Sequence, residues 1–152
     1  MAALYEAHYR SLARIVALLL GDRATAEQVV QDAFVSVHRT WRNLQDGDEA
    51  LGYLRRVVVS RARALSAASS APRDPAGAGQ PTPGTRGAVL MAMLGRLPAR
   101  QREALVLRYY AGWPDPQIAA AMGISRRALS ANIQRGMSAL HAFAVPDPRG
   151  GA

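Results

Sequence analysis

The sequence predicts an all-α protein of two small helical domains, three helices in the first and four in the second, joined by a flexible linker. Two observations support this fold class. Apolar residues recur every three or four positions along both halves of the 152-residue chain, which is the spacing of one helix face. Between the halves, residues 68–87 contain four Pro and four Gly and no large apolar side chain. Such a composition cannot offset the entropy of ordering. We therefore expect domains at 1–67 and 88–145 and a loose tail at 146–152.

The first half is predicted to form three helices. The first covers about 4–20 and ends at Gly21. The second begins with a capping box at Thr25, and the third covers 49–67 with Asp48 as its N-cap. The apolar stripe of the second helix consists of Val30, Phe34, Val37, Trp41 and Leu44, and that of the third of Leu51, Leu54, Val58, Ala62 and Leu65.

The second half is predicted to form four helices. A short helix spans 88–95, and the next opens at Pro98 and breaks at Gly112. Asp115 caps a third helix over 117–122, and Ser125 caps the last, which runs to about residue 143. The aromatic residues Tyr109, Tyr110 and Trp113 are expected to pack beneath the last two helices.

Residues 115–140 are predicted to form a helix, a three-residue turn and a second helix. Ala119 lets the two helices approach, Gly123 suits a left-handed turn, and Leu129 faces the core. This is the arrangement of a helix-turn-helix DNA reader, although an ordinary helical hairpin with a solvated basic face fits the spacing too. The second helix carries Arg126, Arg127, Ser130, Asn132, Gln134 and Arg135, which suit guanine, adenine or phosphate.

Two faces of the first half are further candidate interfaces. Arg56, Ser60 and Arg63 share one face of the third helix, and Tyr53 lies nearby to stack on an unpaired base. The same cluster also fits a solvated face. The outer face of the second helix is either plain surface or a docking site for a partner helix. It comprises Gln28, Asp32, Val35, Arg39 and Arg42.

Composition excludes several classes of function. All 19 basic residues are Arg, so no P-loop lysine or Schiff-base lysine exists. Without Cys there is no disulfide, thiolate metal site or thiol nucleophile. His8, His38 and His141 are isolated, and we therefore predict no metal site, no cofactor and no enzymatic activity.

The net charge of +8 favours an anionic partner, with nucleic acid as the first candidate. Residues 88–152 hold eight Arg against three acidic residues, so most of the excess lies in the second half. No apolar run approaches the ~18 residues that span a bilayer, and the first residues lack the pattern of a signal peptide. A cytoplasmic protein without a membrane partner or a small-molecule substrate is expected.

Six stretches of the sequence resemble one family. LYEAHYRSL (4–12), GDRATAEQVVQDAF (21–34) and YLRRVVVSRAR (53–63) resemble region 2 of bacterial sigma factors. LPARQREALVLRYY (97–110), IAAAMGIS (118–125) and RGMSAL (135–140) resemble region 4. The two sets occur in the right order across a linker. The chain therefore resembles the SigE-like, two-domain sigma factors of the extracytoplasmic-function (ECF) group.

The resemblance implies a transcription initiation factor whose partners are RNA polymerase core, promoter DNA as duplex and melted strand, and an anti-sigma protein. It assigns polymerase binding to Gln28, Gln31, Asp32, Val35 and Arg39. It assigns the melted minus-ten element to Asn43, Asp46, Tyr53, Arg56, Ser60, Arg61 and Arg63. It assigns the minus-thirty-five element to Ser125, Arg126, Arg127, Ser130, Ala131, Gln134 and Arg135.

Two departures from the family pattern remove cations. After Arg63 the chain reads ALSAASS where the family has further basic residues, and Ser130 stands where it usually has Lys. Each lost phosphate contact would weaken DNA binding and its dependence on salt. Two alternatives therefore remain open: a stand-alone helix-turn-helix regulator, and a sigma-like interaction protein that has lost promoter recognition.

Overall fold

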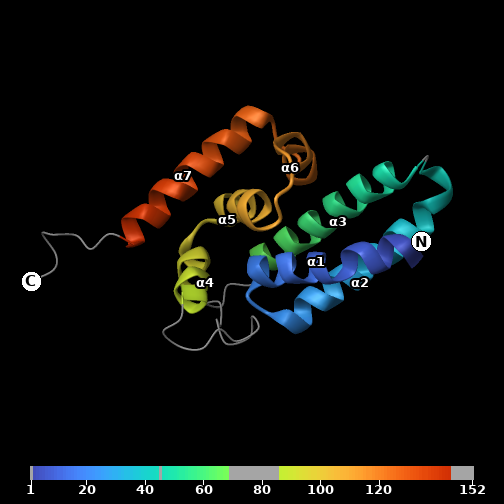
Figure 1. Ribbon diagram of the computed structural model, residues 1–152, viewed down its shortest axis with the longest axis horizontal. Coiled ribbons are helices and arrows are strands. Elements are labelled where there is room, and N and C mark those ends of the chain that lie inside the picture. Colours follow the sequence, from blue (N-terminus) through green and yellow to red (C-terminus); the bar gives the residue numbers. More distant parts are fainter. Residues whose placement is uncertain (1, 45, 69–85, 145–152) are drawn as a thin grey trace, which may run out of the picture.

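The computed structural model describes residues 2–44, 46–68 and 86–144, and all regular structure in these ranges is helical (Figure 1). The predicted fold class, with three helices followed by four, is confirmed. The helices are α1 (Ala2–Leu20), α2 (Arg23–Thr40), α3 (Gly47–Ala68), α4 (Arg86–Arg96), α5 (Ala99–Leu105), α6 (Asp115–Met122) and α7 (Arg126–Ala144). A 3-10 turn, η1 (Trp41–Asn43), follows α2, and a π-helical turn, η3 (Val106–Tyr110), follows α5.

The first three helices pack side by side around an apolar core. Gly21 joins α1 to α2 in the left-handed conformation (φ 75°), and its N–H donates to the carbonyl oxygen of Ala17 at 2.8 Å. A stripe of each helix is buried, as the apolar spacing predicts. The stripes include Leu12, Ile15, Val16 and Leu19 of α1, Val30, Phe34 and Val37 of α2, and Leu54, Val58 and Ala62 of α3.

Aspartate side chains cap α2 and α3 earlier in the chain than predicted. The carboxylate of Asp22 accepts hydrogen bonds from the N–H of Ala24 (3.1 Å) and the hydroxyl of Thr25, so the predicted capping box at Thr25 is wrong. At the start of α3, Asp46 accepts from the N–H of Glu49 at 2.8 Å, and the predicted cap at Asp48 is wrong as well. A carboxylate suits both sites because the first N–H groups of a helix have no partner within it.

Two residues assigned to apolar stripes are exposed instead. Trp41 is 38% exposed, because α2 ends at Thr40 and the chain tightens into η1. Leu65 is 42% exposed and follows Ala62, the last buried residue whose side chain is described on α3. The apolar periodicity of the sequence thus extends beyond the part of each helix that a neighbouring helix covers.

The second half is built around α5, whose last four residues are all buried. The π-helical turn η3 leaves Tyr109 and Tyr110 61% and 54% exposed, so the prediction that they pack beneath the last helices is wrong. Trp113 is 8% exposed, as predicted. Helix α6 begins at Asp115, whose carboxylate accepts two 2.8 Å hydrogen bonds from Arg108 instead of capping the helix.

Helices α6 and α7 form the predicted helix-turn-helix. Gly123 adopts the left-handed conformation (φ 70°), and the N–H of Ile124 donates to the carbonyl oxygen of Ala119 at 3.0 Å. The hydroxyl of Ser125 accepts from the N–H of Ala128 at 3.1 Å and caps α7, as predicted. Leu129 is 1% exposed and anchors α7 to the core.

The two halves pack against each other, and their buried residues form one hydrophobic cluster. Helix α6 lies against α3, and α5 lies between the first three helices and α7 (Figure 1). Helix α4 begins at Arg86, two residues earlier than predicted. The remainder of the predicted linker, after Ala68, and the tail at 146–152 lie outside the described residues. None of the described helices has the length and hydropathy to cross a membrane.

Candidate nucleic-acid interface

The second helix of the helix-turn-helix presents an open basic face. Arg126 and Arg127 are exposed in the first turn of α7, which contains no acidic residue. Ser125, Ser130, Gln134 and Arg135 are also exposed, and Ala131 is half-buried. The Ser125 hydroxyl already accepts the N–H of Ala128. The flanking arginines therefore have more freedom to reach a ligand than the capping serine.

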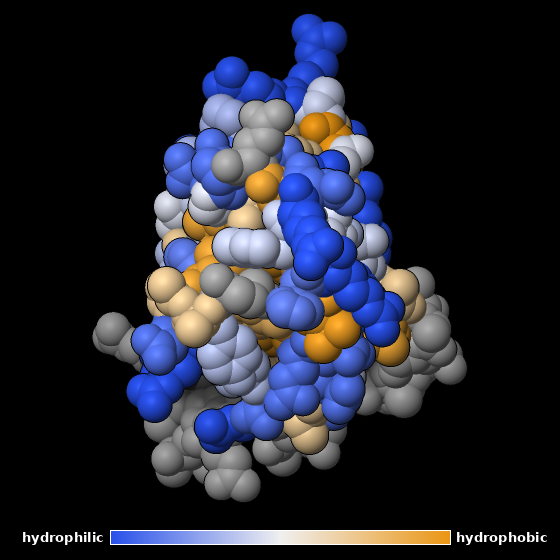
Figure 2. Space-filling view, turned by 90° about the vertical axis from the view of Figure 1, so that its right-hand side faces the viewer, coloured by the Kyte–Doolittle hydropathy of each residue, from blue (hydrophilic) through white to orange (hydrophobic). Residues whose placement is uncertain are grey.

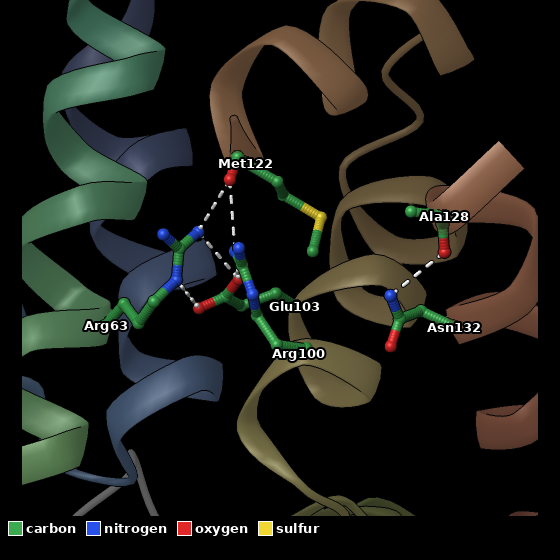
Figure 3. A network of polar contacts seen from close by, with 6 residues as sticks. All are labelled: Arg63, Arg100, Glu103, Met122, Ala128 and Asn132. Carbon is green, nitrogen blue, oxygen red and sulfur yellow. Dashed lines mark hydrogen bonds and ion pairs between the residues drawn. The ribbon is translucent and has the colours of Figure 1, made fainter. Parts of the chain in front are cut away.

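Asn132 differs from the other polar residues of α7. Its side-chain amide donates to the carbonyl oxygen of Ala128 at 2.9 Å and is partly buried (Figure 3). Gln134 is exposed. Of the two amides that the sequence offers for adenine, Gln134 is thus the one available to an incoming base.

The polar face of α3 is only partly open. Arg56 and Ser60 are exposed and Tyr53 is half-buried, so these three can meet a strand of nucleic acid. Arg63 is also half-buried, but its guanidinium already has partners in the second half of the chain. The spacing of Arg56, Ser60 and Arg63 places them on one face, whereas their surroundings differ.

Arg63 belongs to a polar network that joins the two halves (Figure 3). Its Nε and Nη2 donate to the two carboxylate oxygens of Glu103, each at 3.1 Å. Arg100 reaches the same carboxylate at 3.5 Å, and both arginines donate to the carbonyl oxygen of Met122, at 3.2 and 3.0 Å. The Glu103 side chain is only 4% exposed. The sequence analysis did not predict a role for Glu103. The one feature that could have pointed to it is its position directly before an apolar run, where an acidic side chain can become buried.

Arg55 makes the second polar contact between the halves. Its Nη1 donates to Oε1 of Gln117, and its guanidinium lies 4.5 Å from the centre of the Trp113 ring. Burial lowers the pKa of Arg55. Burial, and then the positive charge of Arg55, lower the pKa of His8. A hollow of about 330 Å³ adjoins this contact between α3 and α6 and includes Arg56 in its lining.

The outer face of α2 carries the residues assigned to polymerase binding. Gln28 donates to Asp32 at 3.2 Å, and Gln31 donates to the hydroxyl of Tyr9 at 3.4 Å. Val35 is 50% exposed, as a docking face requires, and Arg39 is also exposed.

Arg61 connects this face to α3. Its Nη2 donates to the Ser36 hydroxyl at 3.0 Å, and its Nη1 lies 3.9 Å from Asp32. The Arg61 side chain is 45% exposed. Arg61 thus holds α2 and α3 together, in addition to the role in strand binding that the resemblance assigns to it.

Asn43 and Asp46 lie in the turn between α2 and α3. Both are exposed, and the Asp46 carboxylate caps α3. Figure 2 shows that hydrophilic side chains cover most of the end of the molecule where this turn lies. Within the described ranges, no group of three or more His, Asp or Glu side chains is placed to hold a metal ion.

Comparison with known proteins decides the family. The family model "Sigma-70 region 2" matches residues 4–68, and "Sigma-70, region 4" matches residues 88–140. An "RNA polymerase sigma-E factor" of Streptomyces coelicolor is 28% identical over 138 residues, covering 86% of this chain and 77% of that protein. An "ECF RNA polymerase sigma factor SigL" of Mycobacterium tuberculosis is 29% identical over 155 residues, covering 92% and 86%. The chain belongs to the ECF group of sigma factors.

Sigma factors direct RNA polymerase to promoters, and this ECF sigma factor is a transcription initiation factor of that kind. The chain is also similar to a solved structure described as CnrH in complex with the cytosolic domain of CnrY. The TM-score is 0.68 at 24% identity, covering 94% of this chain and 86% of that one. At this identity the likeness supports the fold.

Proposed function

We propose that the promoter contacts of this ECF sigma factor are divided between its halves, with residues 1–67 acting as region 2 and residues 88–145 as region 4. Helix α7 enters the major groove of the minus-thirty-five element through Arg126 and Arg127. The α2–α3 turn and the exposed face of α3 hold the melted minus-ten strand. The outer face of α2 docks on RNA polymerase core.

The observation that carries this proposal is the open, acid-free N-terminal face of α7. Arginine can bond both acceptors of a guanine edge, and the N-terminus of a helix favours phosphate. The exposed Arg56 and Ser60 of α3 suit a strand that is recognised by stacking and charge. The exposed Val35 among polar neighbours suits a protein partner on α2.

We extend the proposal to the remaining partners. The solved structure similar to this chain holds a second protein, so an anti-sigma protein that covers these surfaces is a natural partner here too. The chain works inside the cell, on the polymerase, and carries out no catalysis itself. Ser130 stands in place of the family's Lys and removes one contact to a DNA phosphate. Promoter recognition is therefore expected to depend more on Arg126 and Arg127.

The test is run-off transcription with purified core polymerase and genomic promoter fragments. Specific transcripts that require both core and this chain are expected, together with weak binding of the chain alone to promoter duplex. Tight duplex binding without specific transcription would instead identify a stand-alone regulator. Binding to core without transcription would identify a sigma-like interaction protein.

A further inference from the structure

The contact between the two halves uses side chains that DNA binding requires. Arg63 lies on the face of α3 assigned to the melted strand, yet its Nε and Nη2 bond both oxygens of Glu103. Two N–H groups directed at a carboxylate have the geometry that a phosphate would use. While this pair exists, those two donors of Arg63 are not available to a DNA strand.

Burial shows that Glu103 is fitted to this contact. Its side chain is 4% exposed, and a carboxylate removed from water needs strong partners. Arg100, on the same helix, reaches only one of its oxygens, at 3.5 Å, whereas Arg63 of α3 bonds both. Among the described residues of the second half, only Arg100 bonds this carboxylate, through Oε2, and Arg63 of α3 supplies the partner of Oε1.

Two further bonds make the contact specific along its length. Arg102 is 6% exposed and donates to the carbonyl oxygen of Leu19, at the end of α1, at 3.2 Å. About two helical turns before Arg63 on α3, Arg55 bonds Gln117 of α6 and covers Trp113. The contact therefore joins α1 and α3 to α5 and α6 through three separate arginines.

We propose that α3 is a docking surface for the chain's own helix-turn-helix unit, and that Glu103 competes with the melted promoter strand for Arg63. The proposal rests on the proposed role of α3 in strand binding. In the docked form α7 stays exposed, so duplex recognition remains available. Strand capture requires the halves to separate, and its apparent affinity is reduced by the fraction of chains that are docked.

The direct test measures the separation of the halves by pulsed electron paramagnetic resonance. The chain has no Cys, so spin labels at Ser11→Cys and Ser138→Cys, both exposed positions of α1 and α7, report one distance. In the unliganded protein we expect a narrow distribution. Glu103→Gln, which removes the charge but keeps the shape, should broaden it toward longer distances. Glu27→Gln is the matched control, because Glu27 pairs with Arg23 within α2.

The second readout is the binding of a labelled single-stranded DNA of random sequence. Glu103→Gln should bind about three- to tenfold more tightly than Glu27→Gln, which corrects for the loss of one negative charge. The same DNA, at saturation, should shift the spin-label distance of the unsubstituted protein. Equal behaviour of Glu103→Gln and Glu27→Gln in both measurements would overturn the proposal.

A further variant keeps the test decisive if Glu103→Gln does not fold. Gln117 is exposed, and Gln117→Ala removes the acceptor of Arg55 without disturbing the core. It should shift the distance in the same direction by a smaller amount, and an unchanged distance would count against docking. Run-off transcription tests the proposed function separately from these measurements of self-docking. Loss of specific transcripts with an intact spin-label response would reject the proposed function and leave self-docking in place.

Discussion

Arg102 of α5 donates a hydrogen bond from Nη1 to the carbonyl oxygen of Leu19 at 3.2 Å, across 83 positions of the chain. The same guanidinium donates from Nε to Leu94 (2.8 Å) and from Nη2 to Leu97 (2.8 Å). Burial lowers the pKa of Arg102, and the charge of Glu103 opposes that effect. One side chain thus orders the α4–α5 connection and fixes it to the end of α1.

Replacing Arg102 should therefore destabilise the protein strongly. Arg102→Met keeps an unbranched apolar stem but removes the guanidinium, so three carbonyl oxygens lose this donor. We expect a loss of about 2–4 kcal/mol in the free energy of unfolding. Urea denaturation measures it. Arg127→Met is the control, since Arg127 is exposed on α7 and should change stability by less than about 0.5 kcal/mol. Equal losses in the two variants would show that Arg102 is not structural.

The cap of α2 gives a prediction about pH. Asp22→Ala removes the acceptor for the Ala24 N–H and the Thr25 hydroxyl, and should cost about 1 kcal/mol. Asp22→Asn keeps an acceptor and should cost less. The hydrogen bond from Thr25, followed by those from the backbone, lowers the pKa of Asp22 despite its partial burial.

The sign of the pH effect follows from this lowered pKa. Between the folded and unfolded pKa values of Asp22 the unfolded chain binds more protons than the folded chain. The stabilisation that ionised Asp22 contributes is therefore fully present above the unfolded pKa and is lost as pH falls through the folded pKa. Urea titrations in the acid range should therefore show a shallower loss of stability for Asp22→Ala than for the unsubstituted protein. Parallel curves would exclude Asp22 as a source of the acid sensitivity.

The sequence predicts the helices well because each must bury a stripe of the 3.6-residue period, and Val30, Phe34 and Val37 carry that signal in a short window. Periodicity does not predict where a stripe loses its cover, which is why Trp41 and Leu65 are exposed. Local patterns also leave the capping residue ambiguous. Thr25 matches a capping box, but the left-handed conformation of Gly21 places Asp22 at the first N–H groups of α2.

The pairing of Arg63 with Glu103 lies beyond any local pattern. The two residues are 40 positions apart, with the predicted linker between them, and each also fits a solvated helix face. Sequence analysis could place Arg63 on the polar side of α3, but not beside a buried carboxylate. Helix-turn-helix geometry, by contrast, is a short-range property of Ala119, Gly123 and Leu129, and it was predicted from them.

The close approach of α5 and α7 predicts that a Gly→Ala change destabilises α7 at one position, whereas the same change on α3 stabilises the protein. A Cβ at Gly136 of α7 would lie 2.8 Å from Cδ1 and 3.1 Å from Cγ of Leu105, which is 3% exposed. At Gly52 of α3 nothing lies within 4 Å. Both Gly→Ala changes gain helix propensity, about 1 kcal/mol, but Gly136→Ala must also displace Leu105, at about 1–3 kcal/mol.

Thermal denaturation of the two variants separates these effects. Gly52→Ala should raise the melting temperature, and Gly136→Ala should melt below Gly52→Ala. A melting temperature of Gly136→Ala equal to that of Gly52→Ala would mean that Leu105 moves aside without cost. In that case α5 and α7 would be packed less tightly than the structure describes.

Arg127→Ala provides the sharpest test of the role of α7. Arg127 is exposed in the first turn, where a recognition helix meets base edges. Loss of a bidentate guanine contact removes about 1–3 kcal/mol of discrimination, so run-off transcription from a promoter should fall about tenfold or more. Affinity for core polymerase, followed by fluorescence anisotropy, should not change. Arg10→Ala on α1 removes the same charge from an exposed position and is the control. If core affinity fell together with transcription, or if Arg10→Ala matched Arg127→Ala, the assignment of α7 to the minus-thirty-five element would be wrong.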